Sequence, residues 1–484
     1  MLFSSFSFLF WFLPLTLLFY FLPPAIIRTC AYGGAWGGAA VATQGGSGAR
    51  MLAYQNGVLL VASLLFYAWG EPLYVLLMLG VIAADTLLGI LLERSPRKRL
   101  WLAVAVVGHI SLLFYYKYAA FFAHVLGFYI QSPRLPLGIS FYTFQALSYL
   151  IDVYRGETKA ERSPALLGVY VALFPQLVAG PIVRYTEIAA ALHHRTHSIN
   201  GIAAGSRRFA AGLAKKLLLA NPMGALFTML VARSGLSALG AWTALLAFAL
   251  QIYFDFSGYS DMAIGLGRAF GFRFPENFRY PYTASSITDF WRRWHITLSS
   301  FFREYVYIPL GGNRKGVFRT VCHLFAVWAL TGLWHGAAWS FLLWGIYYFL
   351  LLVAEKFLLP KLPRLPAGLY RGFTLLAILL GWMIFAFDGS TAALSLPAMG
   401  RFLATLTGFY GFFTPADLYD TVRHLPLLLL CAIGSTPLPK QIYRQTVCKK
   451  RRFWLSAALP LAACALSLGA LSAGGFNPFL YFRF

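Results

Sequence analysis

Charged residues are scarce in this 484-residue chain: Asp, Glu, Lys and Arg make up 12% of it, and hydrophobic residues make up 59%. An ordinary soluble domain carries about 25% charged residues, so this composition excludes that class. The apolar residues come in long blocks, and a helix needs about 20 of them to cross a bilayer. Runs such as Leu375–Ala386 lack the two-residue alternation of barrel strands. The sequence therefore predicts an all-α, polytopic membrane protein.

Acidic residues are the scarcest charges, with 16 Asp and Glu against 40 Lys and Arg and a formal net charge of +24. In a soluble protein this excess would indicate nucleic-acid binding, but no RNA- or DNA-binding motif is present. Basic residues instead flank the apolar segments, as they do on the cytoplasmic side of a membrane, where anionic lipids attract them. The charge therefore predicts a lipid bilayer as partner and no nucleic acid.

Motifs for metal, nucleotide and serine chemistry are also missing. The five cysteines are scattered and form neither a CxxC pair nor a zinc spacing. No Gly-x-Ser-x-Gly elbow, Walker loop or dinucleotide fingerprint occurs. His193, His194 and His197 form an HHxxH string, but no acidic partner accompanies them, which favours a solvated loop. We therefore expect no metal and no bound cofactor.

Twelve segments reach or approach the length of a membrane span. They are residues 6–27, 54–70, 72–92, 100–129, 163–182, 208–231, 238–255, 318–335, 338–358, 371–387, 424–438 and 453–473. The first has no basic residue before it, so we expect a retained span and not a cleaved signal peptide. The basic tracts Glu93–Arg99 and Lys440–Arg452 place their loops in the cytoplasm and both chain termini outside. This pattern predicts a multi-pass protein of the cell inner membrane, with a flexible Gly-rich insert at 28–50.

Two further regions, Pro136–Gly156 and Arg268–Lys315, are too polar for ordinary spans and too apolar for ordinary loops. Polar or irregular chain persists at membrane depth only when it is buried in protein or lines a wet cavity. We therefore expect re-entrant or partly embedded helices around a cavity, in addition to about 11–13 spans. Functional residues are expected in those helices.

The segment Trp291–Tyr305 contains the first candidate site. At helical spacing, Trp291, Trp294, His295, Leu298, Phe302 and Tyr305 share one side, and Arg292, Ile296, Ser299 and Arg303 share the other. The arginines on the second side are free to bind carboxylates, phosphates or carbonyls. The alternative is an amphipathic helix at the cytoplasmic surface with snorkelling arginines.

The second candidate site is His335, which lies between two apolar segments and is flanked by Trp334 and Gly336. An imidazole is costly to place in lipid, so an intramembrane histidine is a functional candidate. Small residues beside it, such as Gly332, let another group approach closely. A neutral imidazole is also the natural base for a hydroxyl that attacks a thioester at neutral pH. The alternative is a packing histidine that hydrogen-bonds a neighbouring helix.

Several long strings give the sequence its resemblance to a known family. They are SLLFYAWGEP at 63–72, PLGISFYTFQALSYLIDVYRG at 136–156, FPQLVAGPIVRY at 174–185, DFSGYSDMAIGLGRAFGFRFPENFRYPYTASSITDFWRRWHITLSSFFREYVYIPLGGNRKG at 255–316, LTGLWHGAAWSFLLWG at 330–345 and the terminal FNPFLYFRF. The chain resembles the membrane-bound O-acyltransferases, and within them the bacterial alginate O-acetylation branch. The resemblance runs nearly from end to end and implies one membrane-embedded domain over 1–484, with a catalytic core at 255–345 around a central tunnel.

The resemblance also implies residue roles. His335 matches the family's catalytic histidine in the tunnel, His295 matches the second histidine beside it, and Asn277 belongs to the same core. If both histidines serve one reaction, their rings should face a common cavity within about 10–15 Å of each other. The aromatic walls of that cavity are expected from Trp291, Trp294 and Trp334. Arg292, Arg293 or Arg303 are expected near its cytoplasmic mouth, where the donor binds.

The function implied by the resemblance is that of an O-acetyltransferase. Proteins of this branch take an acyl group from a cytoplasmic thioester, acetyl-CoA or an acylated carrier, and pass it to a periplasmic acetyltransferase partner or an exported polysaccharide such as alginate. The sequence departs from the branch in having Glu304 where Asp is common and in lacking an Arg after Phe385. Two alternatives stay open: D-alanyl transfer to teichoic acid, and a transporter or channel that makes no bond. The paired Trp-His strings argue against the transporter.

Overall fold

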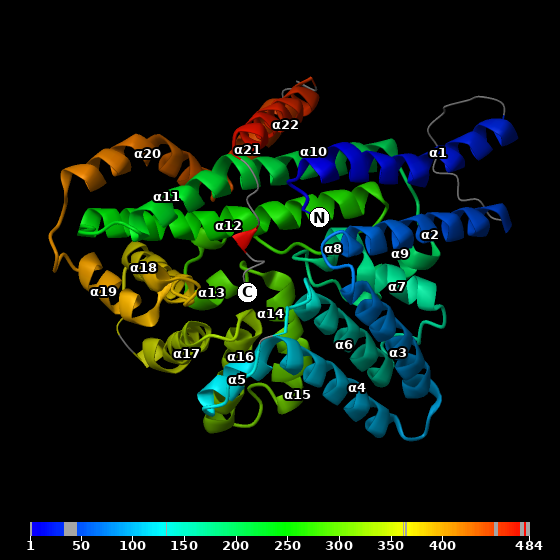
Figure 1. Ribbon diagram of the computed structural model, residues 1–484, viewed down its shortest axis with the longest axis horizontal. Coiled ribbons are helices and arrows are strands. Elements are labelled where there is room, and N and C mark those ends of the chain that lie inside the picture. The colour runs from blue at the N-terminus through cyan, green and yellow to red at the C-terminus, as the bar shows by residue number, and fades with distance from the viewer. Residues whose placement is uncertain are drawn as a thin grey trace. The chain divides into compact units, whose positions relative to one another are not determined.

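The computed structural model describes residues 2–32, 46–131, 133–361, 363, 365–449, 454–474 and 479–480. Every regular element in this part of the chain is a helix, which confirms the predicted all-α class (Figure 1). The chain divides into two compact units, Met1–Leu213 with Tyr259–Pro275, and Ala214–Gly258 with Glu276–Phe484. Three sequence predictions fall partly outside the described residues: the Gly-rich insert at 33–45, the basic tract at 450–452, and the terminal string at 475–478 and 481–484.

The described residues of the first unit form ten α-helices and the end of an eleventh. They are α1 (Leu13–Tyr32), α2 (Gly46–Ala68), α3 (Tyr74–Arg94), α4 (Lys98–Leu113), α5 (Ala119–Val125), α6 (Ile139–Arg155), α7 (Pro164–Ala172), α8 (Phe174–Leu177), α9 (Tyr185–His193), α10 (Ile199–Ala214) and the end of α12 (Ala238–Ala269). Helices α3, α4 and α6 pack against one another (Figure 1). The polar region at 136–156 is α6, and its residues 139–150 are all buried, as expected of an embedded helix. Gly138 and Gly156, both with left-handed backbone, flank it.

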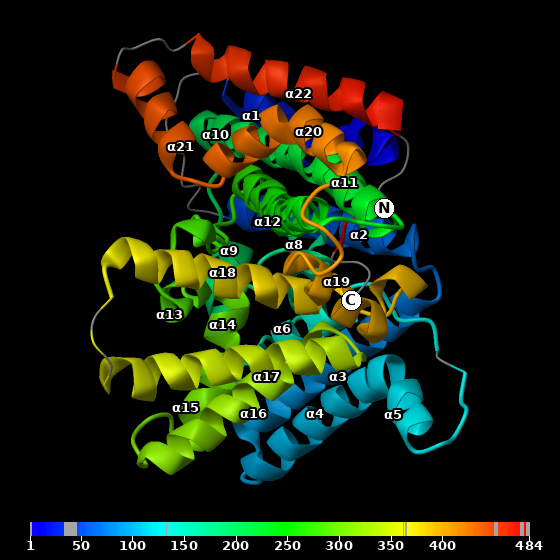
Figure 2. The ribbon, with the colours of Figure 1, turned by 90° about the vertical axis from the view of Figure 1, so that its left-hand side faces the viewer.

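The second unit holds the polar region at 268–315 from Glu276 onward. Its helices are α11 (Asn221–Val231), the start of α12, α13 (Ile287–Trp291), α14 (Ile296–Phe302), α15 (Ile308–Leu310), α16 (Val317–His335), α17 (Trp339–Val353), α18 (Ala367–Ala386), α19 (Leu396–Leu406), α20 (Pro415–Gly434), α21 (Leu438–Tyr443) and α22 (Leu455–Gly474). Helices α16, α17 and α18 lie side by side (Figure 2). A Cβ on Gly332 would meet the carbonyl oxygen of Phe341, and one on Gly345 would meet that of Trp328. Glycine at these positions therefore allows the close packing of α16 on α17.

Eight helices in the described ranges are long and apolar enough to span a membrane. They are Gly48–Ala68, Tyr74–Arg94, Lys98–Val125, Ala238–Ala269, Val317–His335, Trp339–Lys361, Ala367–Ala386 and Leu455–Gly474. A ninth is added if Pro415–Gly434 and Leu438–Val447, bent by 70°, form one span. Pro437 lies at that bend, where a proline cannot continue the preceding helix. The chain is thus a multi-pass membrane protein, as predicted.

Three predicted spans differ in the structure. Segment 163–182 is interrupted, because α7 ends at Ala172 and a new helix, which contains Pro175, begins at Phe174. Proline has no N–H for the bond to the residue four positions earlier, so one straight helix cannot pass through it. Segment 208–231 consists of α10, a π-helical turn at Lys215–Ala220 and α11. Segment 6–27 begins with a π-helical turn, Ser7–Phe12, which leads directly into α1.

Candidate active site

The segment that carries His295 is not one continuous helix. α13 ends at Trp291, α14 begins at Ile296, and His295 between them has a left-handed backbone with φ of 43°. A non-glycine residue in this region costs about 1–3 kcal/mol, so the surroundings must hold it there. Among the described non-glycine residues, Tyr280 alone shares a positive φ. The prediction of one continuous helix over Trp291–Tyr305 is therefore wrong.

The break is made by the chain around Asn277. In a continuous helix, the amide of Ile296 would donate to Arg292, but here it donates to the backbone carbonyl of Asn277 at 3.0 Å. The amide of Thr297 donates to the Asn277 side chain at 3.3 Å. The carbonyl of Arg293 accepts from the amide of Arg279 at 2.9 Å. Bonds to a distant segment thus replace the bonds that would have continued the helix.

The same asparagine fixes the proton of His295. Asn277 Oδ1 accepts from the Thr297 amide and, at 3.0 Å, from the Thr297 hydroxyl. A backbone amide can only donate, so this atom is the oxygen of the side-chain amide. His295 Nδ1 lies 3.1 Å from it and must therefore carry the proton that it donates. Complete burial lowers the pKa of His295 to about 3, so the ring is neutral and Nε2 is its unprotonated nitrogen.

Asn277, which the resemblance assigns to the same core as the histidines and which we expected among the substrate-binding residues, lies beside the pocket. Its side chain is 0% exposed and is not part of the pocket wall. Its contacts are instead with His295, Ile296 and Thr297. Asn277 therefore orients the imidazole of His295 from the side of the ring that faces away from the pocket. Functional side chains are commonly held in position by such supporting hydrogen bonds.

His335 is the last residue of α16 and is 6% exposed. Gly336 follows in an extended conformation, and a Cβ at that position would collide with the ring of Phe341. The imidazole lies edge-on to Trp344 and Phe385, with ring centroids 5.0 and 5.1 Å away. The glycine after His335 and the aromatic rings around it therefore pack tightly against the imidazole and fix its orientation.

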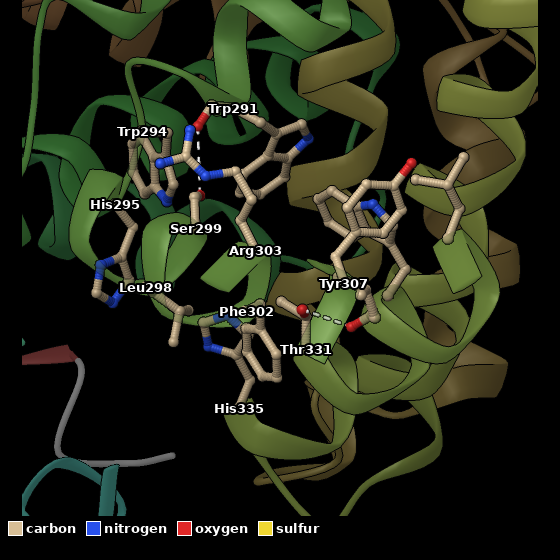
Figure 3. Close-up of a pocket in the computed structure, with 13 residues that line it drawn as sticks. Trp291, Trp294, His295, Leu298, Ser299, Phe302, Arg303, Tyr307, Thr331 and His335 are labelled. Carbon is tan, nitrogen blue, oxygen red and sulfur yellow. Dashed lines mark hydrogen bonds between the residues drawn. The ribbon is translucent and has the colours of Figure 1, made fainter. Parts of the chain in front are cut away.

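One pocket of about 170 Å³ brings the two histidines together. It is lined by Trp291, Trp294, His295, Leu298, Ser299, Phe302, Arg303, Tyr307, Leu324, Val327, Trp328, Thr331 and His335 (Figure 3). The indole of Trp334 lies 5.8 Å from the His295 ring and 5.0 Å from the His335 ring. The two imidazoles cannot be farther apart than the sum of these distances, which lies within the 10–15 Å expected for one reaction. The common cavity predicted from the sequence is therefore present.

The predicted tryptophans hold different positions around this pocket. Trp291 and Trp294 line it, and Trp291 packs edge-on against Trp328 with ring centroids 4.8 Å apart. Trp334 does not line it but is 3% exposed and packs against both histidines. Two of the three thus form the wall, and the third packs against both imidazoles.

Of the three predicted arginines, one lines the pocket and two do not. Arg303 lines the pocket, its side chain is 63% exposed, and it pairs with Glu304 at 3.0 Å. Arg293 pairs with Asp289 at 2.8 Å, and neither Arg292 nor Arg293 lines the pocket. The break before α14 rotates these two residues away from the face that carries Arg303. Of the three, Arg303 alone is placed to meet a molecule that enters the pocket.

Asp289 helps to hold the turn of α13. Burial raises its pKa, but hydrogen bonds from the Arg293 guanidinium and the Ser285 amide outweigh burial and leave the pKa below its usual value. The carboxylate is therefore charged at neutral pH, and it restrains Arg293 beside α13.

Sequence reasoning missed Glu355, which follows α17. Its two carboxylate oxygens accept from the amides of Ile287, at 2.7 Å, and Thr288, at 3.0 Å. These are among the unsatisfied amides at the start of α13, which leads to Trp291 and His295. The available signal was a lone carboxylate in an apolar segment, Trp339–Lys361, which is a functional candidate by default.

The HHxxH histidines have partners that the local sequence did not show. His193 lies 3.0 Å from the Glu161 carboxylate, and His197 lies 2.8 Å from the Tyr20 hydroxyl. The absence of an acidic partner, inferred from the sequence, is therefore wrong for His193. Within the described residues no three His, Cys, Asp or Glu side chains gather as a metal site.

Comparisons with known proteins found one family model and several relatives. The model of the membrane-bound O-acyltransferase family matches residues 100–384. A probable alginate O-acetylase of Pseudomonas putida is 37% identical over the full length of both chains. A peptidoglycan O-acetyltransferase of Helicobacter pylori is 36% identical over 72% of this chain and 69% of its own length. A teichoic acid D-alanyltransferase of Bacillus subtilis is 28% identical over 52% of this chain and 67% of its own length.

Proposed function

The chain belongs to the membrane-bound O-acyltransferase family, and from this premise we propose that it transfers an acetyl group from a cytoplasmic thioester for the O-acetylation of an exported polysaccharide. The observation that carries the proposal is the pair of histidines on one small aromatic pocket, with the Nε2 of His295 held as an acceptor. A transporter has no need of a neutral imidazole oriented in this way, whereas acyl transfer to a hydroxyl requires a base.

The reaction joins an acceptor hydroxyl to the thioester carbonyl. His335 takes the hydroxyl proton as the oxygen attacks, so a C–O bond forms and the C–S bond breaks. The leaving thiolate then receives that proton from His335, and the products are an ester and a free thiol. A base of this kind contributes about 10²–10⁴-fold to the rate.

His295 has the supporting role in this proposal. Because its Nδ1–H is used by Asn277, its Nε2 can only accept a hydrogen bond. It therefore accepts a hydrogen bond from a substrate, either from the attacking hydroxyl or from an amide N–H of the thioester substrate. Such positioning is effective only if the imidazole itself does not rotate.

The acyl donor is a soluble substrate, acetyl-CoA or an acylated carrier, and no cofactor is required. Both donors carry phosphate, and the exposed guanidinium of Arg303 at the pocket wall is suited to bind it. In this proposal the mouth beside Arg303 opens on the cytoplasmic face of the inner membrane, and both chain termini lie outside. The acceptor enters from the other face, as a sugar hydroxyl or as a hydroxyl of a periplasmic acetyltransferase partner.

Alginate is the polysaccharide that the relatives favour. The relative named for alginate acetylation matches the whole of this chain at 37% identity, whereas the D-alanyltransferase matches about half of it at 28%. D-alanyl transfer to teichoic acid is the second candidate, because a teichoic acid D-alanyltransferase is also among the relatives.

The test is acetate release by mild alkali from the exported polysaccharide of cells that carry wild-type protein or His335→Ala. We expect His335→Ala to lose ester acetate while it still inserts in the membrane. His124→Ala, an exposed histidine on α5 outside the pocket, is the matched control and should keep wild-type acetylation. Wild-type acetate with His335→Ala would end the assignment, and alanyl esters in place of acetyl esters would favour the second candidate.

A further inference from the structure

The loop between α19 and α20 (Figure 1) carries four aromatic side chains that are 57–77% exposed. They are Phe409, Tyr410, Phe412 and Phe413. Exposed apolar residues are ordinary when they occur singly, but a contiguous group marks a surface that binds a protein or a membrane. No Asp, Glu, Lys or Arg occurs from Phe402 to Ala416. Loop 409–413 is therefore a neutral, aromatic binding surface.

The backbone of this loop is fixed by the start of α12. The carbonyl oxygens of Gly411 and Phe412 accept from the first two amides of α12, both at 2.9 Å. A helix has unsatisfied donors at this end, so the loop satisfies two of them. Gly408 and Gly411 have positive φ, which glycine adopts without steric cost. These bonds and turns hold the aromatic rings on the outside of the protein.

Ion pairs indicate where this loop lies relative to the membrane. Arg233 precedes α12 and pairs with Asp417 of α20 at 2.6 Å, and Asp417 also accepts from the Ser237 amide at 2.8 Å. α12 is apolar enough to span a membrane, and charged groups are costly at mid-membrane. The start of α12, and with it the loop, therefore lies near the polar surface of the membrane.

The apolar surface continues from the loop onto α20. Four exposed residues of this helix recur at helical spacing and form a stripe: Leu418, Val422, Leu425 and Leu429. With α21, this helix passes as a bent membrane span, so the stripe faces acyl chains. A soluble protein would cover the loop but not the stripe that continues from it. A membrane covers both.

The first unit has a loop of the same kind at residues 126–130. It follows the apolar segment Lys98–Val125, and its rings are Phe128 and Tyr129, of which Tyr129 is 93% exposed. Gly127 has positive φ, and its amide donates to the carbonyl oxygen three residues earlier at 3.1 Å, so the backbone is again fixed. No Asp, Glu, Lys or Arg occurs from Tyr118 to Pro133.

Each loop lies at the end of its membrane segment that lacks basic residues. The segment before loop 126–130 begins with Lys98 and Arg99, and the bent pair that follows loop 409–413 leads to Lys440 and Arg444. Anionic lipids attract basic residues at a membrane surface. Aromatic side chains are the other common anchors at the membrane–water interface, and they need no charge.

We propose that loops 126–130 and 409–413 insert their aromatic rings into the membrane interface and anchor the ends of their segments there. The partner is a phospholipid surface. The phenylalanine rings contact the upper part of the acyl chains, and the tyrosine hydroxyls remain at the level of the headgroups. This inference does not depend on the proposed acyl transfer.

The test introduces the photoreactive analogue p-benzoylphenylalanine at Phe412 or Tyr129 of the full-length protein, in cells grown with radioactive phosphate. Light joins the analogue to the molecule that contacts it, and labelled phospholipid makes the protein radioactive. Both side chains point outward, so the analogue fits without repacking. We expect about five- to tenfold more label at each position than at Lys159, because the loop of Lys159 is exposed and charged and remains in water.

A second measurement uses cysteine at the same positions. In open membrane fragments, Phe412→Cys and Tyr129→Cys should react several-fold more slowly with a water-soluble maleimide than Lys159→Cys, because the bilayer excludes the reagent. The native cysteines give a baseline that is measured in the wild-type protein.

The two loops are assessed separately, and the same results overturn the proposal for either one. Label no higher than at Lys159, or a maleimide rate equal to that of Lys159→Cys, would mean that the rings stand in water. Crosslinks to a protein without lipid label would mean that a protein partner covers the loop.

Discussion

Asn277 Oδ1 and His295 Nδ1 lie 3.1 Å apart, and this contact determines which nitrogen of the histidine faces the pocket as an acceptor. The Thr297 amide, which donates to the same oxygen, excludes the opposite orientation of the asparagine amide. Asn277 therefore helps to break the helix before α14, through its backbone carbonyl and its side chain, and its side chain also selects the tautomer of the residue at the break. This relationship leads to the first prediction.

Asn277→Asp should make acyl transfer sensitive to acid. A carboxylate against Nδ1–H favours the charged imidazolium, so the pKa of His295 rises from about 3. Below the new pKa, Nε2 carries a proton and cannot accept. We expect the variant to lose activity as the pH falls from 8 to 6, and the pH–rate profile of kcat measures this.

The control for this prediction is Thr297→Val, which removes one donor to Asn277 and adds no charge. It should lower activity evenly across that pH range. An unchanged acid limb in Asn277→Asp would contradict the assigned tautomer.

His295→Ala and His335→Ala should not be additive. Residues that act as one unit give a double variant about as impaired as the worse single variant. We expect His335→Ala to lose about 10²–10⁴-fold and His295→Ala/His335→Ala to lose little more. Initial rates of acetyl transfer in membranes measure this. Losses that multiply would indicate that the two imidazoles serve separate steps.

Glu355→Gln should loosen α13. The amide retains one oxygen acceptor but offers NH₂ to the second backbone amide, so one of the two bonds is lost. A hydrogen bond to a charged group contributes about 1.5–3 kcal/mol. We expect a lower melting temperature in detergent and a lower kcat. Tyr370→Phe, which removes the weaker 3.4 Å contact to the same carboxylate, is the control and should have a smaller effect.

The buried pair of Lys216 and Asp255, 2.6 Å apart, should show the cost of an unpaired charge. Both side chains are 3% exposed, and Asp255 also accepts from the Leu480 amide at 2.6 Å. Removal of one partner from a buried pair costs about 3–5 kcal/mol. We expect Lys216→Met to lower the melting temperature more than Lys216→Met/Asp255→Asn, because the amide keeps an acceptor for Leu480. Equal melting temperatures would mean that the pair is not buried in the membrane-bound protein.

Topology is testable by fusion. A reporter placed after Arg452 should be cytoplasmic, and one placed after Phe484 should be periplasmic, because basic residues remain inside. Protease accessibility in intact spheroplasts measures both. If both reporters lie on one side, the last apolar helix does not cross and the proposed sidedness fails.

The sequence by itself determined the membrane class and identified both histidines. Composition and the length of apolar runs are local properties, and hydrocarbon imposes helices on such runs whatever the tertiary contacts. His335 was visible because an imidazole between Gly and Trp in an apolar stretch has a large local cost. His295 was visible through its aromatic neighbours and the long matching string around it.

Only the tertiary structure decided where these groups point. The helical periodicity of Trp291–Tyr305 predicted one face, but amides at 296 and 297 bond to Asn277, eighteen residues earlier, and turn the chain at His295. That turn separates Arg303 from Arg292 and Arg293. Glu355, far along the chain, holds the start of α13 through backbone amides. Backbone amides are identical in every residue except proline, so no pattern of side chains reveals which distant acceptor a given amide will choose.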